Sequence, residues 1–60
     1  MKILRIEDYN YSIVYIEKEN ESYVYKRLFD GNWMSLNGNR WSNVKNANEL
    51  EKLFKKKKDE

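Results

Sequence analysis

The 60-residue sequence contains no cysteine, no histidine and no proline, and it has only two glycines. Without cysteine or histidine the chain can form no disulfide, no zinc site with thiolate or imidazole ligands, and no Ser–His or Cys–His catalytic pair. Both glycines stand in turn signals, so a glycine-rich phosphate-binding loop is also absent. We therefore expect no metal, no cofactor and no catalytic activity, and a protein that binds rather than one that catalyses.

Long apolar runs are also missing. No stretch approaches the ~20 apolar residues that a membrane-spanning helix requires. The first six residues are basic and apolar, but Glu7 and Asp8 interrupt them before the apolar segment of an export signal develops. With no cysteine and no such signal, we expect a soluble protein without a membrane partner, located in the cytoplasm of the producing or host cell.

The short length predicts one domain, residues 1–60, with a thin hydrophobic core. Domains of this size are often stabilised by a disulfide, a metal or a partner chain. Because this composition provides neither a disulfide nor a metal site, a partner chain is the option that remains. Lys, Asn, Ile and Tyr are abundant whereas alanine occurs once, a composition typical of AT-rich coding sequences. Composition and length together favour a phage or another mobile element as the source.

The net charge of +2 arises at the C-terminus. Residues 1–54 carry eight basic and eight acidic side chains, and four consecutive lysines then precede Asp59 and Glu60. We interpret residues 55–60 as a frayed, basic helix end, where lysine suits the negative pole of the helix dipole. A neutral body of this kind lacks the basic stripe of a dedicated nucleic-acid-binding protein.

Turn signals separate runs of β-branched and aromatic residues. Asp30-Gly31 and Asn37-Gly38 are dipeptides preferred in two-residue hairpin turns, and Glu19–Glu21 is a polar break. The runs between these signals predict an antiparallel meander of four to five strands, at about 2–7, 9–18, 22–29, 32–36 and 39–44.

The C-terminal segment has helical periodicity. Ala47, Leu50, Leu53 and Phe54 recur at spacings of three and four residues, and Asn46 with Glu49 resembles a capping box. We predict a helix over about 47–57 that packs on one face of the meander, which is an α+β fold. The alternative is a small SH3-like barrel with the same helix.

Loop lengths predict which side chains share a face of the sheet. Two-residue loops at both glycine turns place Leu28 opposite Trp33, and Met34 opposite Trp41. The loop near 19–21 is not fixed by the sequence; we favour three residues, Glu19–Glu21, because this parity separates an aliphatic face from an aromatic one. The expected aliphatic face, covered by the helix, comprises Val14, Ile16, Val24, Leu28, Trp33 and Val44. The expected aromatic face comprises Tyr11, Ile13, Tyr15, Tyr23, Tyr25, Phe29, Met34, Leu36 and Trp41.

The aromatic face is the candidate contact surface, since a single helix covers only one side of a sheet and tyrosine and tryptophan are enriched at interface hot spots. The candidate partner-binding residues are Tyr11, Tyr15, Tyr23, Tyr25 and Trp41. Tyrosine is also frequent in strands because of its β-propensity alone, and a barrel would enclose some of these rings.

Three functions compete. The leading hypothesis is a small non-enzymatic protein-binding module, in its narrowest form a phage or mobile-element inhibitor of a host defence protein, acting through the aromatic face or a strand edge. The second is nucleic-acid binding, with aromatic rings stacked on bases and basic side chains on phosphates. The third is a structural homodimer formed through the aromatic face. The candidate phosphate contacts are Arg27, Arg40, Lys55, Lys56, Lys57 and Lys58.

Overall fold

A computed structural model describes residues 1–60 as a five-stranded antiparallel sheet followed by one helix. The elements are β1 (Lys2–Asp8), β2 (Tyr11–Lys18), β3 (Glu21–Leu28), β4 (Trp33–Asn37), β5 (Arg40–Asn43) and α1 (Ala47–Lys58). The strands lie in the order β1-β2-β3-β4-β5, so each one pairs with its neighbour in the chain. The predicted meander with a C-terminal helix is therefore confirmed.

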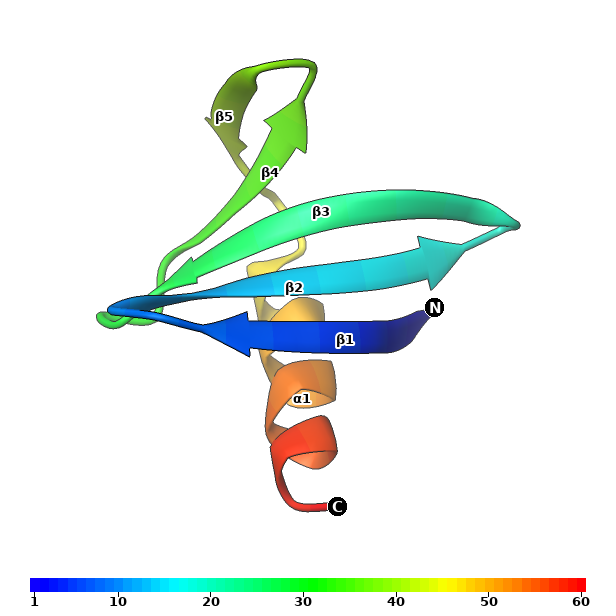
Figure 1. Ribbon diagram of the computed structural model, residues 1–60, viewed down its shortest axis with the longest axis vertical. Helices are drawn as coiled ribbons and strands as arrows, with labels where there is room; N and C mark the ends of the chain where they lie inside the picture. The colour runs from blue at the N-terminus through cyan, green and yellow to red at the C-terminus, as the bar shows by residue number, and fades with distance from the viewer.

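The sheet is open, and the barrel alternative is wrong. β1 and β5 form its two free edges. Figure 1 shows β1, β2 and β3 as a curved layer of long strands, from which the β4–β5 hairpin projects. The pairing of β3 with β4 extends only over Tyr25–Arg27 and Trp33–Ser35, so the hairpin diverges from the layer instead of curling back to β1.

The loop between β2 and β3 has two residues, not the three that we expected. Glu19 and Asn20 form it, and Lys18 pairs directly with Glu21. The φ angles of Glu19 and Asn20 are 54° and 65°, and positive φ at both central positions is the mark of a type I′ turn. Glutamate is an unusual residue for this conformation, which explains why the turn signal in the sequence was weak.

The loop between β3 and β4 has three residues, 29–31, whereas two were expected. The N–H of Gly31 donates to the carbonyl of Leu28 (2.9 Å), and the φ of Gly31 is 93°. The glycine thus occupies the left-handed position that closes a three-residue hairpin loop. As a result Arg27, and not Leu28, lies opposite Trp33.

The turn between β4 and β5 comprises Gly38 and Asn39, one residue later than expected. Only Gly38 has a positive φ, of 65°, which fits a type II′ turn with glycine at its first central position. The partner of Trp41 is therefore Leu36 instead of Met34. Because the shift in pairing is an even number of residues, these side chains still share the face predicted for them.

A β-bulge in β1 adjusts which side chains face the helix. The register shifts between Ile3 and Arg5, which leaves Leu4 as the additional residue. Side chains alternate along a regular strand, so Ile3 and Ile6 would otherwise lie on opposite faces. The bulge places Ile3 in the buried core, with Ile6 packed against it, while Leu4 remains 46% exposed.

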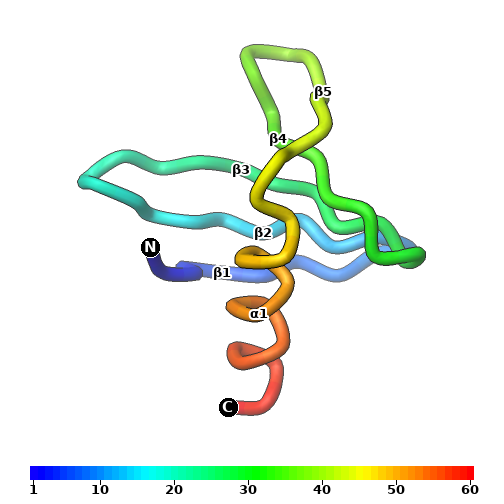
Figure 2. The backbone as a smooth tube through the Cα atoms, turned by 180° about the vertical axis from the view of Figure 1, so that it is seen from behind, coloured from blue at the N-terminus to red at the C-terminus, as the bar shows by residue number.

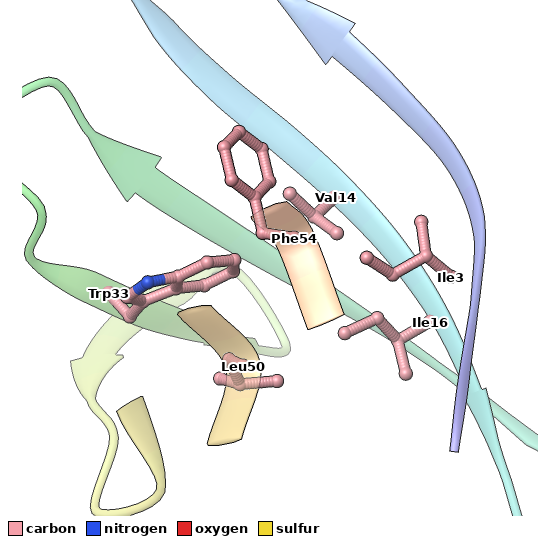
Figure 3. Close-up of a cluster of buried hydrophobic side chains, with 6 residues drawn as sticks. All are labelled: Ile3, Val14, Ile16, Trp33, Leu50 and Phe54. Carbon is pink, nitrogen blue, oxygen red and sulfur yellow. The ribbon is translucent and has the colours of Figure 1, made fainter. Parts of the chain in front are cut away.

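The core lies between the sheet and α1, which covers one face only. Figure 2, viewed from the helix side, shows α1 running across the direction of the long strands. In Figure 3 the two helix residues lie between the indole of Trp33 and three aliphatic residues of β1 and β2. The six buried residues are Ile3, Val14, Ile16, Trp33, Leu50 and Phe54.

The first turn of α1 differs from the expected capping box. Asn46 has φ −101° and ψ 36°, and its side chain makes no capping hydrogen bond. An N-cap side chain reaches the helix from a β-region backbone, which this residue does not have. The first helical bond runs from the N–H of Leu50 to the carbonyl of Asn46 (3.1 Å). With 12 residues and five lysines, α1 is neither long nor apolar enough to span a bilayer.

Candidate protein-interaction face

The two faces of the sheet differ in what covers them. α1 packs on the face that carries Val14, Ile16 and Trp33, and no element lies over the opposite face. We call this opposite side, together with its apolar side chains, the open face. The register assigns eight apolar residues from β2 to β5 to it: Tyr11, Ile13, Tyr15, Val24, Leu28, Met34, Leu36 and Trp41. Each of them is half-buried, because its neighbours on the same face partly cover it.

The structure divides the five predicted contact residues between the two faces. Tyr11, Tyr15 and Trp41 lie on the open face, as expected. Tyr25 pairs with Val14 on the helix side, and its ring meets the indole of Trp33 edge-on, with 6.4 Å between centroids. The two-residue β2–β3 loop causes this reversal, because a change of one residue in register moves a strand's side chains to the other face.

Tyr23 also lies on the helix side, near the start of β3 and beyond the core. It pairs with Ile16, and its hydroxyl donates to a carboxylate oxygen of Glu21 (2.7 Å). Nearby negative charge raises the pKa of this phenol, through the hydrogen bond to Glu21 first. Its ring is 39% exposed, but it does not join the aromatic residues of the open face.

Three residues were not anticipated as part of the open face. Val24 and Leu28 were expected in the core, and their places there are taken by Tyr25 and Arg27. The third is Lys26, which lies between Ile13 and Met34 in the register. A correct length for the β2–β3 loop would have revealed all three from the sequence.

The ammonium group of Lys26 is held by aromatic rings near the middle of the open face. Its Nζ lies 4.4 Å from the ring centroid of Trp41 and 4.9 Å from that of Tyr11, both within cation–π range. Lys26 forms no ion pair and no side-chain hydrogen bond within the chain. The half-buried residue Lys26 thus places a cation on an apolar surface without an acidic partner.

A margin of charged side chains that contact one another borders the open face at β1. The guanidinium of Arg5 lies 4.4 Å from the ring centroid of Tyr15 and 3.1 Å from Glu7 Oε2. The hydroxyl of Tyr15 donates to Glu7 Oε1 (3.1 Å). In the register, Glu7 lies opposite Ile13, and Ile13 lies opposite Lys26, so an acid, an apolar residue and a base form one row across three strands.

The candidate phosphate contacts are mostly engaged elsewhere. Arg27 lies on the helix side, where Glu51 accepts two hydrogen bonds from it (2.7 and 2.8 Å). Lys58 pairs with Asp8, and Lys57 lies 3.3 Å from Glu60. Lys55 and Lys56 are exposed on α1, and Lys55 Nζ is 3.8 Å from Glu51. Arg40 is exposed at the start of β5, next to the turn of the β4–β5 hairpin.

A hollow of about 410 Å³ lies between the β3–β4 loop, the β4–β5 hairpin and the start of α1. None of its lining residues has an acidic, basic or nucleophilic side chain. They are Leu28, Gly31, Asn32, Trp33, Met34, Asn43, Val44 and Ala47. No group of three acidic side chains converges in a way that could hold a metal ion.

The chain matches no family model, and no curated protein or solved structure is significantly similar to it. The role of the open face must therefore be inferred from its own residues and from what surrounds them.

Proposed function

We propose that this protein is a small, non-enzymatic protein-binding module that acts through its open face. The observation that carries the proposal is a surface of eight apolar side chains, contributed by four neighbouring strands, over which no part of the chain lies. Contiguous exposed apolar surface usually marks a contact site. Tyrosine and tryptophan, which supply three of the eight, are enriched among the residues that dominate binding energy.

Several side chains of the open face are already held by contacts within the chain, which favours binding. Cation–π contacts fix Tyr11 and Trp41 around Lys26, and a hydrogen bond fixes Tyr15 to Glu7. Side chains that are ordered before binding lose less conformational entropy when a partner docks. The thin core adds a second reason, because only six of the 60 residues are buried and further burial at an interface would stabilise the fold.

The face supports the proposal better than the strand edges do. β1 carries a bulge at Leu4 and charged side chains at Lys2, Arg5 and Glu7, and both features oppose pairing with another strand. The other edge, β5, has only four residues. Backbone pairing at either edge would therefore be short or hindered.

The nucleic-acid alternative has less support. It requires aromatic rings and phosphate contacts on one surface, but the rings lie on the open face, whereas α1, which carries the four lysines, packs on the opposite face of the sheet (Figures 1 and 2). Arg27 is occupied by Glu51. An inhibitor of a host defence protein is the narrower form of the protein-binding proposal, and it additionally requires that a host protein occupy the face.

Site-specific photo-crosslinking tests the proposal without knowledge of the partner. A photoreactive phenylalanine replaces Ile13, in the middle of the open face, and in a matched control it replaces Lys52, exposed on α1. After irradiation of the cells that make the protein, we expect a defined protein adduct from position 13 and none from position 52. Absence of an adduct from position 13, or equal adducts from both positions, would overturn the proposal.

A further inference from the structure

The charge on Lys26 restricts what can cover the open face. Lys26 is a half-buried residue whose ammonium group has two aromatic rings around it but no carboxylate, and a partner that docks there removes water from that group. Burying an unpaired charge is strongly unfavourable, whereas a charge that meets an opposite charge with hydrogen bonds is tolerated. The occupant must therefore bring an acidic group to the position above Lys26.

The open face itself carries an acidic group, Glu7, at a matching position. Its carboxylate already pairs with Arg5 (3.1 Å) and accepts from Tyr15 (3.1 Å), so a lysine from a partner would join this cluster. Glu7 and Lys26 lie in the same row, one strand to either side of Ile13 on β2. Neighbouring strands are about 4.8 Å apart, so the acid and the base are nearly equidistant from β2. Rotation by 180° about an axis along β2 exchanges the β1 and β3 positions, and it therefore exchanges Glu7 with Lys26.

We propose that the occupant of the open face is a second copy of this chain, packed face to face about a two-fold axis that runs along β2. This inference rests on the proposed use of the open face and adds the identity of its partner. Ile13 of each copy meets Ile13 of the other on the axis. Lys26 of each copy meets Glu7 of the other, so the contact contains two equivalent ion pairs, as an isologous interface requires.

Two other symmetric arrangements of the same face leave the charges unfavourable. An axis along β3 brings the two copies of Lys26 together, and an axis along the row brings Lys26 to Lys26 and Glu7 to Glu7. Like charges that face each other across an interface disfavour the complex. With the axis along β2, the two copies of Glu17 approach at the rim, where solvent and the neighbouring Lys2 screen them.

The expected contact is small. With the axis along β2, β2 of one copy packs over β2 of the other, and β1 packs over β3. The projecting β4–β5 hairpin stays outside this contact. Three strands of about 8 residues give an overlap at the lower end of specific interfaces. We therefore expect a reversible dimer with a dissociation constant of about 1–100 μM, the range of small, transient contacts.

Charge reversal tests the pairing. Sedimentation velocity is measured for the wild type, Lys26→Glu, Glu7→Lys and the double variant, with Lys52→Glu as a charge-matched control on the outer side of α1. We expect the wild type and the control to dimerise alike, each single variant to dimerise at least about tenfold more weakly, and the double variant to recover most of the loss. Circular dichroism melts establish that each variant remains folded, and Ile13→Asp supplies a second, independent disruption at the axis.

The outcomes separate this inference from the proposed function. A wild type that stays monomeric up to about 1 mM, or a double variant that does not recover, overturns the dimer. If the crosslink from position 13 then joins the chain to a different protein, the open face is still a binding site and only the identity of its partner is wrong. If no crosslink forms either, both proposals fail together.

Discussion

Glu51 of α1 accepts two parallel hydrogen bonds from the guanidinium of Arg27 on β3, of 2.7 and 2.8 Å, where the helix meets the sheet. Its Oε1 also accepts from the indole N–H of Trp33 (2.8 Å), and the guanidinium lies 4.7 Å from the ring centroid of Phe54. Bidentate pairs of this kind fix orientation as well as distance. The cluster therefore determines how α1 lies on the sheet.

Replacing the carboxylate tests this role of Glu51. In Glu51→Gln the charge is lost and the planar match to Arg27 is broken, while the shape of the side chain is kept. Because both partners are about three-quarters buried, we expect unfolding to become easier by about 1–3 kcal/mol in urea titrations. The same substitution at exposed Glu17 is the control and should change stability by no more than about 0.5 kcal/mol. Equal effects at the two positions would show that the cluster does not stabilise helix docking.

The same carboxylate makes stability depend on pH. The hydrogen bond from Arg27, helped by that from Trp33, lowers the pKa of Glu51 from 4.5 to about 2. A folded-state pKa below the unfolded value adds stability that is complete above the unfolded pKa and is lost as the pH falls through the folded one. We therefore expect the free energy of unfolding to decrease between pH 5 and pH 2, by up to about 3 kcal/mol from this group.

Two variants separate the contributions to this acid transition. Glu51→Gln should remove most of the slope between pH 5 and pH 2. Asp8, whose pKa is lowered by Lys58 and then by Ser12, titrates in the same direction, so Asp8→Asn should remove a smaller part because the pair is exposed. A slope that persists unchanged in Glu51→Gln would show that other carboxylates control acid unfolding.

The elements of this fold follow from local sequence patterns, whereas the faces of the sheet do not. Strand and helix boundaries lie within two residues of those predicted, because alternation and helical spacing are local signals. The assignment of Tyr25 and Val24 depended instead on the β2–β3 loop, where one residue more or less reverses a whole strand. Glutamate is not typical of a tight turn, so the sequence did not indicate that Glu19 adopts a positive φ.

Long-range pairs were equally hidden in the sequence. Nothing in the local pattern connects Glu51 with Arg27, which are 24 residues apart, and Arg27 therefore looked free to bind phosphate. The bulge at Leu4 was likewise invisible, because its effect emerges only when β1 is aligned with β2. Tyr11 and Tyr15 were placed correctly because the odd positions of β2 share a face. Trp41 was placed correctly because the one-residue errors at the β2–β3 and β3–β4 loops cancel and the shift at the β4–β5 turn preserves parity.

Two leucines provide a matched test of the core. Leu50 is fully buried, and Leu4 is 46% exposed at the bulge. Truncation of a buried leucine removes transfer free energy and leaves a cavity, so Leu50→Ala should lower the free energy of unfolding by about 2–5 kcal/mol, enough to unfold much of a domain this small. Leu4→Ala should cost less than about 1 kcal/mol. Thermal melts of both variants measure the difference in stability. Similar melting temperatures for the two variants would contradict the position of α1.

The β2–β3 turn offers a test of the register on which the open face depends. In a two-residue type I′ turn both residues need positive φ, and Asn-Gly is the preferred pair. The double variant Glu19→Asn, Asn20→Gly should therefore stabilise the protein by about 1 kcal/mol, since glutamate is costly in the left-handed region.

A three-residue loop predicts the opposite ranking of variants. Insertion of one glycine after Asn20 would be accommodated by such a loop, whereas in the observed turn it forces either a bulge or a shift that moves Tyr25 out of the core and Val24 into it. We expect the insertion to destabilise the fold while the Asn-Gly pair stabilises it, both measured by urea unfolding. Nuclear Overhauser effects between Hα protons across β2 and β3 would confirm the register directly. They are expected at the non-hydrogen-bonded residue pairs, where the two Hα protons face each other. If the insertion proved neutral and Asn-Gly destabilising, Tyr25 would belong to the open face, and the row that joins Glu7, Ile13 and Lys26 would not exist.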